Sequence, residues 1–137
     1  MADGEASLRR LVWKRANARC EYCHLPSNCD VMPFCVDHII ARKHGGPTVP
    51  ENLALACTLC NSYKLDNLSG IDPQTGLITR LHQPRQDDWL RHFRWQSAEL
   101  RGLSDIGRTT IEVLKINLGQ RVEHRELLIV LNMFPQP

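Results

Sequence analysis

Apolar positions divide the first half of the chain into a helix, two strands and a second helix. Between residues 8 and 16 they recur at helical spacing, with Ser7 as the expected N-cap. The runs FCVDHII (34–40) and LALAC (53–57) are typical of strands, and a loop rich in glycine and proline separates them. The segment TLCNSYKLDN (58–67) predicts a short helix.

The second half predicts a strand pair followed by two helices. GIDPQTG (70–76) is a cluster of turn formers, and we interpret it as the boundary between two parts of the chain. Beyond it, residues 77–82 and 89–95 are expected to pair as strands. Residues 104–119 should form a helix capped by Ser104 or Asp105 and ending near Gly119, and residues 122–134 a second helix. We therefore expect two parts, 7–70 and 71–137, the second packed on or beside the first.

Length and composition set the general class. At 137 residues, the chain is expected to form one domain or a domain with an extension. It has no apolar run of membrane-spanning length, and MADGEASLRR lacks the layout of a signal peptide. We expect a cytoplasmic protein with no membrane partner. Its cysteines should then be reduced, which favours metal binding over disulfides.

Two C-x-x-C pairs predict a structural zinc site. Cys20 and Cys23 form one pair, and Cys57 and Cys60 form the other. Each pair presents two thiolates on one side of a tight turn, so two pairs complete a tetrahedron. A redox motif or ordinary buried cysteines are the alternatives. A four-thiolate zinc site has no open position for catalysis, and it would bring the formal net charge of +2 to about zero. Bulk charge therefore does not argue for nucleic acid.

Asp37 and His38 interrupt the apolar run 34–40, and a charged group there is costly unless it has a partner. The zinc site should bring both residues close to Asn61, which follows Cys60. Neighbouring strand residues point to opposite sides, so the two should have different tasks. Carboxylate and amide oxygens suit Mg²⁺ or Mn²⁺, and a histidine can deprotonate water.

Together these motifs resemble the HNH endonucleases, ββα-metal nucleases with a four-cysteine zinc site. The resemblance runs from about residue 15 to residue 67, through CEYC, VDHII, the GGP loop, ENL and C-x-x-C-N-x-x-K. It implies an α+β fold with a ββα-metal core stapled by zinc. The segment after residue 71 resembles, more loosely, the extension of some bacterial members.

The resemblance also implies residue roles. His38 would be the general base that activates water, and Asn52 would brace the loop and orient His38. Asn61 stands where the family often has histidine, so the signature is H-N-N. Asn61 and Asp37 would hold one catalytic Mg²⁺ or Mn²⁺, and the products would carry 5′-phosphate and 3′-hydroxyl ends.

Several basic residues are candidates for contacts with phosphates. Lys64 lies three residues after Asn61, on nearly the same helix face. Arg42 and His44 lie in the glycine loop, and Arg15 and Arg19 belong to the basic stripe of the first helix. The alternative for each is an ordinary solvated side chain.

Three functions fit the sequence. The first is a metal-dependent endonuclease that cleaves DNA, with RNA as the other possible substrate, acting as a monomer or homodimer. The second is a non-catalytic, zinc-stapled module that binds DNA or RNA, and the third is a zinc-stapled recruiter of a protein partner. A binding-only protein has no need for Asp37, His38, Asn52 and Asn61 together, so the sequence favours the enzyme.

Overall fold

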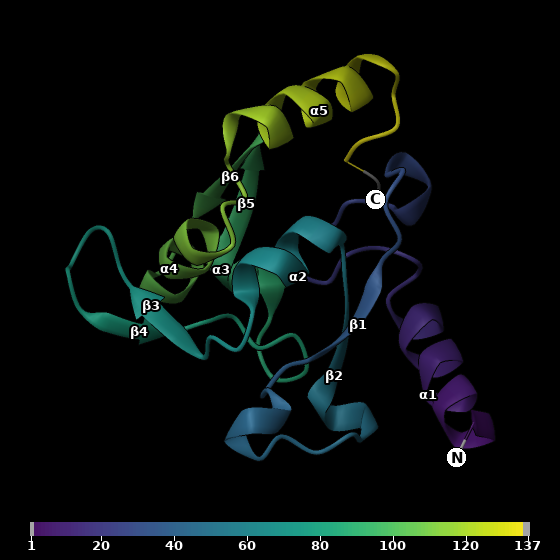
Figure 1. Ribbon diagram of the computed structural model, residues 1–137. Coiled ribbons are helices and arrows are strands. Elements are labelled where there is room, and N and C mark those ends of the chain that lie inside the picture. The colour runs from purple at the N-terminus through teal and green to yellow at the C-terminus, as the bar shows by residue number, and fades with distance from the viewer. Residues whose placement is uncertain (1, 136–137) are drawn as a thin grey trace.

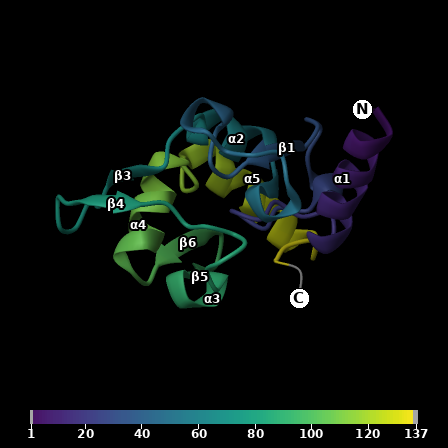
Figure 2. The ribbon, with the colours of Figure 1, turned by 90° about the horizontal axis from the view of Figure 1, so that it is seen from below.

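The computed structural model describes residues 2–135, with the side chains of residues 4–135, as a mixture of helices and small antiparallel sheets (Figure 1). Three hairpins of two strands each alternate with helices along the chain. The β3–β4 hairpin and helix α1 lie at opposite ends of the molecule (Figures 1 and 2). In chain order the elements are α1 (Ala2–Arg15), β1 (Cys35–His38), β2 (Leu53–Ala56), α2 (Thr58–Lys64), β3 (Ser69–Ile71), β4 (Ile78–Arg80), α3 (Trp89–His92), β5 (Phe93–Gln96), β6 (Glu99–Gly102), α4 (Asp105–Val113) and α5 (Gly119–Val130).

The first half has the predicted order of helix, strand, strand and helix. Strands β1 and β2 pair antiparallel, with Cys35 opposite Ala56 and His38 opposite Leu53. All four residues of β2 are buried, because α1 also packs against this strand. Helix α2 follows at once, and Cys57 serves as its N-cap by accepting a hydrogen bond from the Cys60 amide. This compact unit brings the end of β1 close to α2.

The predicted start of the first helix is wrong. Helix α1 begins at Ala2, so Ser7 lies inside it and does not cap it. The Ser7 hydroxyl instead accepts a hydrogen bond from Arg10 Nη2 at 3.2 Å. Glu5 and Ala6 are good helix formers, and they carry the helix across the serine that would otherwise begin it.

The predicted strand pairing after residue 70 is also wrong. Strand β4 pairs with β3, so GIDPQTG contains the end of β3 and the turn of a hairpin. The Asp72 carboxylate closes this turn by accepting hydrogen bonds from the Gln74 amide and the Thr75 hydroxyl, and Gly76 has a φ of 75°. The segment 89–95 splits instead into α3 and β5, and β5 pairs with β6. Asp88 caps α3 through the Leu90 amide.

The two last helices are confirmed in kind, but their bounds differ. Ser104 caps α4 by accepting a hydrogen bond from the Gly107 amide at 3.0 Å. The helix ends at Val113 rather than near Gly119, and Lys115 adopts a left-handed φ of 52°. Asn117 then bonds both the amide and the carbonyl of Leu100 in β6. This contact with a distant strand redirects the chain, and α5 begins at Gly119.

One apolar cluster contains residues from both halves of the chain. Val12 and Leu55 from the first half share it with Phe93, Leu100 and Leu114 from the second. The boundary between residues 70 and 71 stays a prediction. No helix in the described part of the chain is long and apolar enough to cross a membrane.

A buried histidine lies in this core. His82 is 3% exposed, with its ring centroid 5.3 Å from that of Phe93 and 6.4 Å from that of Tyr22. Burial lowers the pKa of His82 to about 4, although the Asp87 carboxylate acts in the opposite direction. The imidazole is therefore neutral in the folded protein at neutral pH.

We predict that His82 makes folding stability sensitive to acid. Its folded pKa lies below the unfolded value of 6.5, so the stability is present above pH 6.5 and declines as the pH falls towards 4. The loss attributable to this group approaches about 3 kcal/mol. Urea unfolding between pH 4 and 7 measures it. His82→Gln should flatten the slope, whereas the exposed control His44→Gln should not; equal slopes in wild type and His82→Gln would contradict the assignment.

Candidate metal centres and catalytic groove

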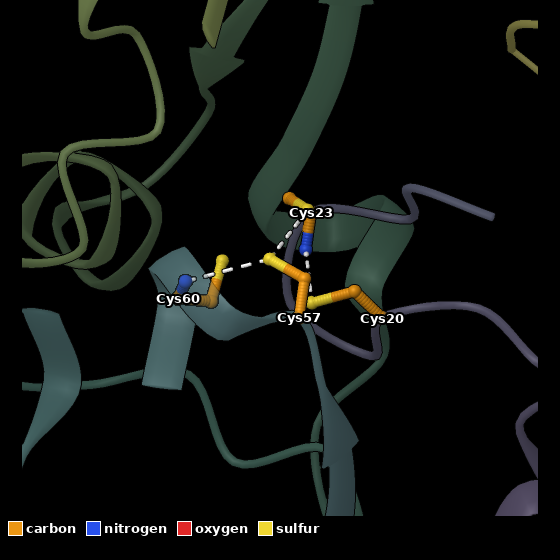
Figure 3. A group of neighbouring side chains, drawn as sticks. All are labelled: Cys20, Cys23, Cys57 and Cys60. Carbon is orange, nitrogen blue, oxygen red and sulfur yellow. Dashed lines mark hydrogen bonds between the residues drawn. The ribbon is translucent and has the colours of Figure 1, made fainter. Parts of the chain in front are cut away.

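The four predicted cysteines converge. Their sulfur atoms all lie within 4.8 Å of one another, and all four residues are buried (Figure 3). In each C-x-x-C pair the second cysteine donates its backbone amide to the first sulfur at 3.4 Å. Cys23 Sγ and Cys57 Sγ, which come from different pairs, are 3.7 Å apart. Four thiolates at this spacing fit the tetrahedral preference of zinc, so the cluster could hold this ion.

Arg121 from α5 also reaches the cysteine cluster. Its Nη2 atom lies 3.1 Å from Cys60 Sγ and 3.8 Å from Cys57 Sγ. Burial lowers the pKa of the guanidinium, but the nearby thiolates of Cys60, Cys23 and Cys57 together raise it by more, so Arg121 stays charged. Sequence reasoning missed this residue, because nothing in the local pattern of α5 marks it as a partner of distant cysteines.

Three of the predicted site residues line one open groove, whereas Asn52 is buried outside its lining. The groove has a volume of about 510 Å³ and lies between the end of β1 and helix α2. Asp37 and His38 line it from the strand, and Asn61 lines it from the helix. Arg42 forms part of the same wall. Although Asp37 and His38 are adjacent in the strand, both have access to this space.

The Asp37 carboxylate is held from the protein interior. Its Oδ2 atom accepts a hydrogen bond from the Tyr22 hydroxyl at 3.0 Å and lies 3.1 Å from Lys64 Nζ. Burial raises the pKa of Asp37, and the Lys64 ammonium lowers it by a smaller amount. Both contacts involve the same oxygen, so Oδ1 is the atom available to a ligand in the groove.

Lys64 lies beneath the groove rather than in it. The residue is 2% exposed, and its ammonium donates hydrogen bonds to the carbonyls of Ile39 and His38 at 3.1 and 3.3 Å. With Asp37 as a third partner, the ammonium is fully engaged inside the protein. The phosphate contact expected from its helix position stays a prediction.

The loop between β1 and β2 (residues 39–52), here called the groove loop, supplies a hydrogen-bonding partner to His38. Asn52 is buried, and its amide oxygen accepts a hydrogen bond from the Ile40 amide, while its Nδ2 donates to the carbonyls of Ile40 and Pro47. The residue after Pro47 is Thr48, whose Oγ1 lies 2.8 Å from His38 Nε2. Asn52 thus fastens the loop that supplies a partner to the imidazole. The sequence motif gave no signal for Thr48.

The other basic candidates occupy two different places. Arg42 and His44 are exposed in the groove loop, and His44 Nε2 lies 3.1 Å from the carbonyl of Asp66. Arg15 donates hydrogen bonds to the carbonyls of Pro50 and Leu53, and with Arg19 it lines a separate polar pocket. Of these four basic residues, Arg42 alone lines the groove with the catalytic candidates.

We predict that purified protein contains about one zinc ion per chain, held by the four-cysteine cluster. Cys57→Ser should lose the ion and much of the folded structure, because Cys57 is one of the four ligands and lies beside Cys23 of the other pair. Elemental analysis and far-UV circular dichroism measure both effects. Cys29 and Cys35 lie outside the cluster, so Cys35→Ser is the matched control. A Cys57→Ser protein with full zinc content would contradict the assignment.

A comparison with protein families agrees with this geometry. Residues 20–67 match the family model described as HNH endonuclease. The match contains both C-x-x-C pairs and the β1–β2–α2 unit. It also contains the groove residues Asp37, His38 and Asn61, and the buried Asn52. Comparisons with curated proteins and with solved structures gave no match. Over residues 20–67, which include the β1–β2–α2 unit, the chain is similar to HNH endonucleases.

Proposed function

We propose that this protein is a metal-dependent endonuclease that hydrolyses DNA phosphodiester bonds. The observation that carries the proposal is the convergence of Asp37, His38 and Asn61 on one groove within the HNH segment. These side chains combine two oxygen ligands for an ion with one group that can accept a proton. That combination suits in-line attack of water on a phosphate.

Asp37 and Asn61 would hold a divalent ion. They offer a carboxylate and an amide oxygen, which Mg²⁺ and Mn²⁺ prefer over softer ligands. When bound, such an ion neutralises the charge that develops on the leaving oxygen. Tyr22 and Lys64 fix the carboxylate from behind, so Asp37 meets the ion in one orientation.

His38 would act as the general base. Thr48 engages Nε2 of the ring, which leaves Nδ1 to take a proton from the attacking water. This role requires Nε2–H to donate to the threonine oxygen, because a ring nitrogen that accepts a proton must carry a lone pair. Asn52 supports the arrangement through the groove loop.

A non-catalytic module that binds DNA or RNA is the second candidate. It is favoured by the Lys64 ammonium, which compensates the charge of Asp37 without any metal. The open groove and the exposed Arg42 and His44 would serve such binding equally well. The two candidates differ in whether the phosphodiester bond is broken.

We predict that the protein nicks or cleaves plasmid DNA in the presence of Mg²⁺ or Mn²⁺, and that His38→Ala lowers the rate by about 10²- to 10⁴-fold. Zinc content and circular dichroism should be unchanged, because His38 lies outside the cysteine cluster. His124→Ala, on α5 and outside the groove, is the control. Equal cleavage by a clean His38→Ala preparation would remove His38 as the base, and a wild type that binds DNA without cleaving it would favour the second candidate.

We also predict that Asn61→Ala raises the Mn²⁺ concentration needed for half-maximal cleavage. Loss of a direct ligand should cost at least the tenfold that is typical of indirect metal partners, so a shift of about tenfold or more is expected. Asn61→Asp should restore activity at low Mn²⁺, because a carboxylate replaces the amide. The neighbouring groove residue Ser62 bonds the Thr58 carbonyl, and Ser62→Ala serves as the control. An unchanged Mn²⁺ requirement in Asn61→Ala would exclude Asn61 as a ligand.

A further inference from the structure

The segment that follows the HNH match reaches the zinc site through one buried arginine. Arg121 is 5% exposed and extends from α5 towards Cys60 and Cys57. Its other terminal nitrogen, Nη1, donates to the carbonyls of Leu114 and Lys115 at 2.8 and 3.3 Å. The guanidinium is therefore held in place by the α4–α5 connection while Nη2 faces the sulfurs.

The charge of Arg121 has no carboxylate partner within ion-pair distance in residues 4–135. A buried cation without a counter-charge is strongly destabilising. Four thiolates around a zinc ion carry a double negative charge, and this centre lies directly beside Nη2. The positive charge of Arg121 and the negative charge of the zinc-bound thiolates would compensate each other. This compensation would make the burial of both groups tolerable.

Arg125, one turn further along α5, provides a contrast. It is equally buried, at 3% exposed, but it donates to the carbonyls of Ala98 and Ile116, both at 2.8 Å. Its guanidinium also lies 5.1 Å from the ring centroid of Trp95. No hydrogen bond joins Arg125 to a sulfur in the described chain. Arg125 feels the charge of Cys23, Cys60 and Cys57 only at longer range, whereas Arg121 donates directly to two sulfurs.

Two more contacts join the same segment to the first C-x-x-C pair. Trp89 donates its indole N–H to the carbonyl of Tyr22 at 2.9 Å, and its ring stacks on His24 with centroids 3.9 Å apart. Arg85 forms an ion pair with Glu21. Tyr22 and Glu21 lie between Cys20 and Cys23, so the segment surrounds the turn that presents these sulfurs.

We infer that Arg121 is a positioning residue of the zinc centre, which it stabilises by donating to the Cys60 and Cys57 thiolates and by balancing their charge. The zinc site of this chain is then built in two parts. Four ligands come from the HNH segment, and the outer partner comes from α5, beyond the end of the family match. The inference does not depend on whether the protein cleaves DNA.

The test compares Arg121→Met with Arg125→Met in the full chain. Methionine keeps much of the side-chain volume and removes the charge and the N–H donors. Zinc affinity is measured by competition with a chromogenic chelator. We expect Arg121→Met to weaken zinc binding by about 10- to 100-fold, as for other outer-shell partners. Arg125→Met should weaken it much less, even if it lowers the urea midpoint by as much.

Cobalt substitution adds a spectroscopic readout that general destabilisation does not affect. Hydrogen bonds to a thiolate stabilise its electrons, so removal of Arg121 should move the sulfur-to-cobalt charge-transfer band to lower energy. The band should not move in Arg125→Met. Equal zinc losses in the two variants, or an unshifted band in Arg121→Met, would overturn the inference. If Arg121→Met does not fold, Arg121→Gln replaces it, because glutamine removes the charge and is too short to keep both sulfur contacts; an unchanged affinity together with an unchanged band there would have the same meaning.

Discussion

The convergence of four cysteine sulfurs is the constraint on which the rest of the molecule depends. Cys20 and Cys23 close the turn after α1, and Cys57 and Cys60 join β2 to α2. Short strands of this kind have little independent stability, so the cluster supplies the fixed point that a large core would otherwise provide. Because α2 starts from it, the cluster also sets where Asn61 lies relative to Asp37.

Around this fixed point, three buried charged side chains of the described chain have identified partners. Asp37 meets Tyr22 and Lys64 on one side and the groove on the other. Arg121 meets the sulfurs, and Asp72 is paired through two oxygens with Arg108, which ties the β3–β4 turn to α4. Burying a charge is costly unless it is paired. Of these contacts, the one from Arg121 to the sulfurs crosses between the two halves, where it adds to the apolar cluster that they share.

The sequence predicted the features that depend on short spacing. They are the two C-x-x-C pairs, the strand that contains Asp37 and His38, and the helix that begins after Cys57. Each of these could be predicted because neighbouring residues alone determine it. The errors arose where distant residues decide the outcome. Asn117 ends a helix by bonding Leu100, and β4 pairs with β3 rather than with the segment that contains β5. Thr48 and Arg121 could not be found at all, because their partners are assigned only by the folded chain.

The buried ammonium of Lys64 has a consequence for how the two ions would behave. Because an internal cation already faces Asp37, the carboxylate is compensated whether or not the groove contains an ion. A divalent ion can then leave and return without exposing the fold to an isolated buried charge. An ion bound by the four sulfurs would have no such substitute. Its removal would leave four buried thiolates that must take up protons, and neutral thiols are no counter-charge for Arg121. One ion would thus be a permanent structural component, and the other a freely exchanging reagent whose supply in solution could switch the groove on and off.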